Sequence, residues 1–206
     1  MASKRYTFPG NQLPYGWTAT RLSAGGQNNG VWTREIKDNK IYWVGVGVGT
    51  ESSWWGEKLS IPVNAVGDII IDATIRQKAN TSADSNFGVG FNLLLVAYPI
   101  RFGTSLILPG AANNYKYSFN NASATPFPGF PSKTAQGPMG GDFISNLRIV
   151  RKNGYVALYM DNLLMGSFAY ASTITSVDIL STWYIANISC QKWLQDLSIY
   201  PSSVVL

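Results

Sequence analysis

Residues 146–170 read NLRIVRKNGYVALYMDNLLMGSFAY, and this stretch decides the fold class of the chain. Three short apolar-rich runs are separated by two turn-forming pairs, Asn153-Gly154 and Asp161-Asn162. An Asn-Gly pair between alternating runs is the strongest local hairpin signal, because both central residues of a type I′ turn need positive φ. The segment is therefore predicted to be a three-stranded antiparallel meander.

The rest of the chain also has the pattern of strands and turns. Glycine and proline recur every few residues, and no segment keeps an apolar period of 3.6 residues for three helical turns. Residues 40–50 alternate instead, with valines on one face and glycines on the other. Further strands are expected at residues 67–78, 86–98, 100–108, 115–119, 176–189 and 194–200. The prediction is an all-β fold.

One long interruption is expected at residues 120–141, which carry four prolines together with many glycines and serines. A loop of this length is usually functional or interfacial. Phe127, Phe130 and Met139 are apolar residues within it, and they are predicted to contact another subunit or a receptor. A loop that packs on itself is the alternative. Nothing marks a domain boundary, so residues 1–206 are expected to form a single domain.

The composition excludes several classes of function. The 206 residues include no histidine and one cysteine, Cys190, which removes the usual nucleophile–base pairs and the usual zinc ligands. We therefore expect no cofactor and no metal. The net charge of +5 is scattered, so nucleic acid is not an expected partner. The first residues lack the apolar segment of a signal peptide, and no run of 18 apolar residues occurs. Synthesis in the cytoplasm without a signal peptide, and no membrane insertion, are expected.

Three pieces of the sequence resemble the concanavalin A-like lectin and glucanase superfamily. They are the opening FPGNQLPYGW at residues 8–17, the meander described above, and the closing WLQDLSIY at residues 193–200. The resemblance implies a jelly-roll β-sandwich of two antiparallel sheets, whose last strand pairs back onto the first. Members of the superfamily bind glycans, hydrolyse them or serve as structural modules, so the resemblance predicts fold better than function.

The glycan-contacting residues are predicted to be Trp54 and Trp55, with Glu51 and Glu57 as hydrogen-bond acceptors. Adjacent strand residues point to opposite faces, so one indole can be exposed for stacking on a sugar ring. The alternative is that both indoles are packed, because tryptophan is highly buried on average. The Glu-x-Asp-x-x-Glu strand of the glucanases is absent, so no catalytic residue is predicted.

The sequence thus favours a non-enzymatic, lectin-like binding or adhesion module. We expect it on the surface of a virion or other particle, as a receptor-binding or capsid-decorating subunit that contacts a glycan or host polysaccharide. A low share of charged residues, 13%, suits burial in a homo-oligomer among other particle subunits, and an ordinary all-β surface is the alternative explanation. A purely structural subunit is the alternative, and a glycan hydrolase is a weaker one.

Overall fold

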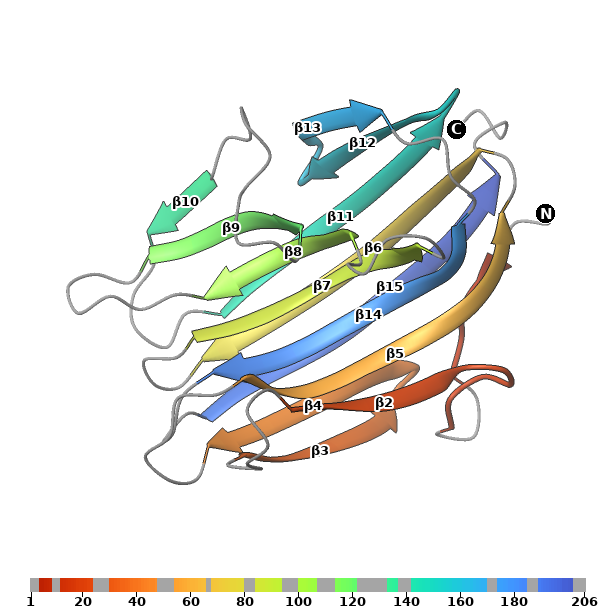
Figure 1. Ribbon diagram of the computed structural model, residues 1–206. Helices are drawn as coiled ribbons and strands as arrows, with labels where there is room; N and C mark the ends of the chain where they lie inside the picture. Colours follow the sequence, from red (N-terminus) through yellow and green to blue (C-terminus); the bar gives the residue numbers. More distant parts are fainter. Residues whose placement is uncertain are drawn as a thin grey trace.

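The computed structural model describes residues 4–8, 12–23, 30–47, 54–65, 68–79, 84–93, 100–106, 114–121, 133–136, 142–169, 174–184 and 189–201. Every element in these ranges is a β-strand, and the strands form two sheets that lie face to face (Figure 1). Among the described residues, no helix is long and apolar enough to cross a membrane.

The first sheet has eight strands. Seven follow the order β13-β12-β11-β6-β15-β4-β3, and β1 pairs with β15 beside that path. Its strands are β1 (Lys4–Arg5), β3 (Gly30–Lys37), β4 (Lys40–Gly47), β6 (Ile69–Ala79), β11 (Asp142–Lys152), β12 (Tyr155–Met160), β13 (Leu163–Ala169) and β15 (Ser189–Pro201).

The second sheet has seven strands in the order β10-β9-β8-β7-β14-β5-β2. They are β2 (Thr18–Ser23), β5 (Trp54–Ala65), β7 (Asp84–Leu93), β8 (Ile100–Leu106), β9 (Asn114–Asn121), β10 (Lys133–Gln136) and β14 (Ile174–Tyr184). All strand pairs in both sheets are antiparallel. The predicted all-β, two-sheet antiparallel sandwich is therefore confirmed.

The core lies between the sheets and is built from alternate positions of the strands that face each other. On β6 the inward set is apolar and buried, whereas Asp72 and Thr74 belong to the outward set. The same alternation on β14 buries Val177 and Ile179 against the core. The largest fully buried apolar side chains are Trp43, Ile41, Leu59, Ile61, Ile69, Ile71 and Ile75.

The first and last described segments lie side by side, as the resemblance predicts. Lys4 and Arg5 pair with β15, and the Tyr6 amide donates to the Leu197 carbonyl at 2.9 Å. The rings of Tyr6 and Phe8 then pack edge-on against Trp17, with ring centroids 5.2 and 5.7 Å away. The N-terminal segment is thereby fastened to both the closing strand and the core.

The predicted meander is present as β11, β12 and β13, joined by two-residue turns. Asn153 and Gly154 have φ of 52° and 75°, and Asp161 and Asn162 have φ of 50° and 66°. Positive φ at both central residues is the signature of the type I′ turn, whose twist matches that of the flanking strands.

Gly154→Ala is expected to lower the free energy of unfolding by about 1 kcal/mol, because an L-residue at positive φ is strained. A Cβ at this position would meet no atom within 4 Å, so the cost isolates the backbone conformation. Urea unfolding measures it. Lys152→Ala, at an exposed position two residues earlier, is the control and should change little. An unchanged midpoint for Gly154→Ala would contradict the turn assignment.

The prediction of one long loop at residues 120–141 is partly wrong. Within it, Lys133–Gln136 form the edge strand β10, paired with β9, and β9 itself runs to Asn121. The alternation in KTAQ is too short to be distinguished from its Pro- and Gly-rich flanks. The expected contacts Phe127, Phe130 and Met139 lie outside the described residues.

Candidate functional site

The outer face of the seven-stranded sheet carries a buried carboxylate. Val177 and Ile179 on β14 face the core, so Asp178 and Leu180 belong to the opposite set. Both are nevertheless buried, Asp178 at 4% exposure and Leu180 at 8%. A buried carboxylate outside the hydrophobic core needs a partner, since an unpaired charge is costly to remove from water.

Asp178 has such partners, and it also keeps a spare acceptor. The Ser176 hydroxyl donates to Asp178 Oδ1 at 3.2 Å, and Lys58 Nζ lies 3.8 Å from Oδ2. Oδ2 itself accepts no hydrogen bond within the described residues. This oxygen has lone pairs to spare, but it is covered in the structure, so a ligand hydroxyl would reach it only after a covering group moves aside.

Small residues surround this carboxylate in the strand register. The cross-strand row through Asp178 reads Gly90, Asp178, Ser60 and Thr18, and the next row reads Gly88, Leu180, Lys58 and Thr20. Glycine in a strand interior leaves room for another group to approach the backbone closely. We call these two rows the β14 strip; they place glycine positions on β7 beside residues with hydroxyl, ammonium and carboxylate groups on β14, β5 and β2.

The predicted tryptophans begin β5, at one end of the β14 strip. Trp54 pairs with Tyr184, and Trp55 pairs with Trp183. By strand alternation, the Trp54 position belongs to the same set as Lys58, and the Trp55 position belongs to the alternate set with Leu59. The indoles of both residues, and the whole of Glu51, lie outside what the structure describes, so their predicted glycan contacts stay predictions.

Glu57 is not on this outer face, and its predicted role as a glycan acceptor is corrected. It is 8% exposed and belongs to the inward set of β5. Its carboxylate accepts from Arg34 Nη1 on β3 and, at 2.7 Å, from Trp43 Nε1 on β4. The side chain thus joins the two sheets through the interior and is not available to a surface ligand. The sequence shows a glutamate beside two tryptophans but not which side of the strand faces in.

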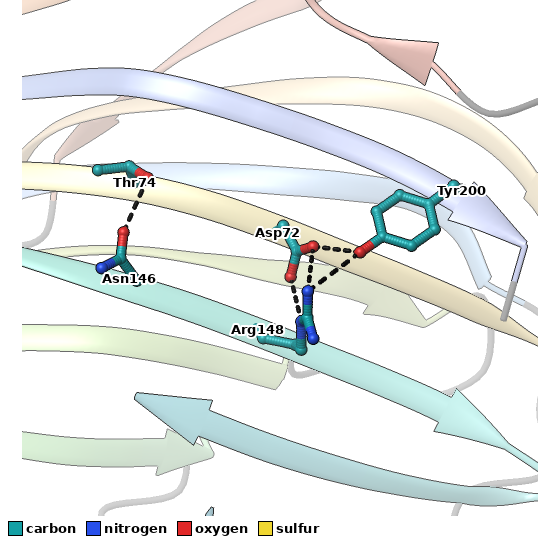
Figure 2. A network of polar contacts seen from close by, with 5 residues as sticks. All are labelled: Asp72, Thr74, Asn146, Arg148 and Tyr200. Atoms are coloured by element: carbon teal, nitrogen blue, oxygen red, sulfur yellow. Dashed lines mark hydrogen bonds and ion pairs between the residues drawn. The ribbon is translucent and has the colours of Figure 1, made fainter. Parts of the chain in front are cut away.

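The outer face of the eight-stranded sheet carries a second polar cluster, which sequence reasoning missed (Figure 2). Arg148 on β11 donates to Asp72 on β6 through Nε at 2.6 Å and Nη2 at 2.9 Å. The hydroxyl of Tyr200 on β15 donates to the same carboxylate. Beside this cluster, Thr74 Oγ1 donates to Asn146 Oδ1 at 3.0 Å. The register of β6, β11 and β15 brings these residues together from segments far apart in sequence.

Burial, followed by the hydrogen bond to Asp72, raises the pKa of Tyr200 to about 12. The pKa of the phenol in the unfolded chain is about 10. Because the folded chain holds this proton more tightly, the contribution of Tyr200 to stability is fully present below pH 10 and is lost towards pH 12. We expect the free energy of unfolding to fall across this window, and Tyr200→Phe to remove part of the fall. Urea unfolding across alkaline pH tests this against Tyr155→Phe, at an exposed position. An equal fall in Tyr200→Phe would contradict it.

No group of three or more potential metal ligands occurs among the residues that the structure describes. The site residues that the structure does assemble are Asp178, Lys58 and Ser176 on one face and the Asp72 cluster on the other. In the sequence Asp178 shows only as a charged residue between Val177 and Ile179, which does not mark it as a site residue.

No protein-family model matches this chain, and no curated protein does. Solved structures, in contrast, match along nearly its whole length. The CBM2 module of the evolved Dit of Lactobacillus casei BL23 phage J-1 has a TM-score of 0.62 at 12% identity, covering 100% of this chain and 99% of that one.

Two other similar structures come from different contexts. Laminarinase from Flavobacterium sp. UMI-01 has a TM-score of 0.60 at 11% identity, covering 96% of this chain and 98% of that one. The Emp47p carbohydrate recognition domain has a TM-score of 0.52 at 11% identity, covering 97% and 94%. At such identities the likeness shows the fold and not the activity. By its two sheets, its paired terminal strands and these neighbours, the chain has the concanavalin A-like jelly-roll fold.

Proposed function

We propose that this chain is a non-catalytic glycan-binding module on a virion surface, as a receptor-binding or capsid-decorating subunit. The observation that carries the proposal is the buried Asp178 carboxylate with its spare acceptor, held beside Lys58 and flanked by glycine positions on β7. Hydroxyl-rich ligands need such fixed acceptors and donors together with space close to the sheet. Trp54, in the same outer set of β5, is the proposed stacking residue.

The spacing of the acidic positions supports binding rather than hydrolysis. Within the described part of this face, the acidic positions are Asp178 and Asp84, which pairs with Tyr184. Tyr184 is six residues from Asp178, so the two acidic positions are about 20 Å apart along the strands. Retaining glycosidases place their carboxyl groups about 5 Å apart, and inverting ones at most about 9.5 Å.

Two of the similar structures support the choice of ligand and of context. The phage Dit module and the Emp47p domain carry carbohydrate-binding names, and the first belongs to a phage protein. The proposed ligand class, a glycan, follows the names of both structures. The proposed location on a virion follows the phage protein alone.

Glycan-array binding tests this proposal. Asp178→Asn keeps the shape of the side chain but removes its charge, so we expect at least tenfold weaker binding, or about 1.4 kcal/mol. Trp54→Ala and Lys58→Ala should weaken binding to a similar degree. Glu35→Gln, at an exposed carboxylate on the other sheet, is the control and should bind like the wild type. Equal binding by Asp178→Asn and Glu35→Gln would refute the site.

An exposed apolar edge favours the second candidate, a purely structural subunit of a multimeric particle. Tyr155, Leu163 and Leu164 are 62%, 52% and 49% exposed on β12 and β13. Exposed apolar side chains at a sheet edge are suited to contact with another subunit. Two results together would favour this candidate. The chain would bind no glycan, and it would form a stable oligomer that dissociates in the double variant Leu163→Lys, Leu164→Lys.

A further inference from the structure

A groove of about 210 Å³ lies on the outer face of the eight-stranded sheet, on the opposite side of the sandwich from the β14 strip. It runs over β6, β11 and β15, and its polar lining comes chiefly from Asp72, Thr74, Asn146, Arg148, Asp196 and Ser198. Its volume equals that of roughly seven waters at ~30 Å³ each. We call it the β6–β11–β15 groove; it has room for one small ring with several polar substituents.

The charges of the groove are neutralised within the protein. Arg148 makes two hydrogen bonds to Asp72, and Arg5 makes two to Asp196, at 3.1 and 2.9 Å. Such two-pronged pairs are the stronger form of the charge-assisted hydrogen bond, and they fix the orientation of both partners. Each carboxylate in the described lining of the groove thus has its own guanidinium, and this lining has no surplus charge with which to attract an anion or a cation. The ligand it suits is neutral.

The neutral polar groups of the groove are held in place, and they include both hydrogen-bond donors and hydrogen-bond acceptors. Asn146 is positioned by the Thr74 hydroxyl at its Oδ1, and its backbone amide donates to Asp161 Oδ1 at 2.8 Å. Its side-chain amide nitrogen supplies donors, the Thr74 hydroxyl, whose hydrogen is donated to Asn146, can accept, and the Ser198 hydroxyl can donate and accept. Alternating donors and acceptors at fixed positions match the hydroxyl groups of a sugar ring, each of which can do both.

An aromatic surface adjoins this groove. Arg76 lies two residues beyond Thr74 on β6, about 7 Å along the strand. It pairs with Trp193, which in turn pairs with Tyr42 on β4. The Arg76 guanidinium is 4.8 Å from the Trp193 ring centroid, and the rings of Trp193 and Tyr42 are 6.0 Å apart and edge-on. The half-buried Trp193 is therefore a ring that Arg76 and Tyr42 hold in place beside the groove.

We infer that the β6–β11–β15 groove is a second carbohydrate-binding site, which takes one neutral sugar residue of a glycan that continues over Trp193. The inference rests on the proposed function in taking glycans as the ligand class. The inferred site lies on the other face of the sandwich from the β14 strip, so the inference and the proposed function can fail separately. Two sites on opposite faces would allow one chain to hold two glycan strands, with a gain in avidity.

The experiment is a titration of the isotope-labelled chain with neutral monosaccharides, followed by backbone amide chemical shifts. The probes are glucose, galactose, mannose and N-acetylglucosamine, with sodium sulfate as the anionic comparison. We expect one of the sugars to shift the amides of residues 72–74, 146–148 and 196–198, and sulfate to leave them unchanged. Asn146→Ala should weaken this response at least tenfold. A second groove variant, Thr74→Val, should weaken the response as well. Its matched control is Thr33→Val, at an exposed position on β3 of the same sheet.

Each outcome bears on one site. Shifts confined to the groove and lost in Asn146→Ala support the inference even if the β14 strip shows none, in which case the proposed function fails at its own site. Shifts confined to residues 58–60 and 176–180 leave the proposed function standing and overturn the inference. A response to sulfate alone, no response in the groove to any sugar, or equal responses in Thr74→Val and Thr33→Val would likewise overturn it.

Discussion

Glu57→Ala should lower the free energy of unfolding by about 3 kcal/mol, because it strips the Arg34 guanidinium of its partner inside the sandwich. Arg34 is 26% exposed at its side chain, and Glu57 is 10% exposed, so water replaces the lost carboxylate only in part. The Trp43 indole, 1% exposed, loses its acceptor as well. The loss of this hydrogen bond adds to the cost of leaving the guanidinium unpaired.

Urea unfolding of the variant measures this loss. Glu35→Ala removes an exposed glutamate that pairs with Lys37 at 3.0 Å, and it should cost less than about 1 kcal/mol. The double variant Arg34→Leu, Glu57→Leu removes the unpaired charge and should recover part of the stability lost in Glu57→Ala. If Glu57→Ala and Glu35→Ala unfold at the same urea concentration, Glu57 does not join the two sheets as described.

Phe8→Ala is expected to destabilise the chain by about 3 kcal/mol, the lower end of the range for a buried aromatic residue. Phe8 is 3% exposed, packs edge-on against Trp17, and has its backbone amide bound to Asn39 Oδ1 at 2.6 Å. Truncating the ring removes apolar contacts from the segment that follows β1. It thereby weakens the attachment of that segment to the core.

Thr7→Ala is the matched control for this prediction, because Thr7 is the exposed neighbour of Phe8 in the same segment. Its unfolding midpoint in urea should stay close to that of the wild type. A loss below 1 kcal/mol for Phe8→Ala, or an equal loss for Thr7→Ala, would mean that the N-terminal segment is not fastened to the core.

The sequence predicted the fold where local chemistry determines the structure. The Asn153-Gly154 and Asp161-Asn162 pairs specify their turns because few other residues tolerate positive φ. The strand predicted at residues 67–78 is present as β6, and its apolar residues Ile69, Ile71, Ala73 and Ile75 alternate as the buried set. The turn at Asp38 and Asn39, with φ of 50° and 58°, was missed although its residues are of the same kind, because charged residues break the apolar pattern of the preceding run at residues 30–37.

The candidate sites were harder to predict because they depend on pairing between distant strands. Asp178 becomes a site residue only when β7 places Gly90 opposite it, and Asp72 meets Arg148 across 76 residues of sequence. No local pattern carries such information. Glu57 illustrates the same limit, since the bonds that commit it to the interior come from β3 and β4.

The most direct test of the account is to incubate the chain with an oligosaccharide that it binds on the array, and to weigh the bound sugar by mass spectrometry. The prediction is that the oligosaccharide is recovered at its original mass, and that Asp178→Asn retains at least tenfold less of it than the wild type. Recovery of shortened sugars, or equal retention by the two proteins, would contradict non-catalytic binding at the β14 strip.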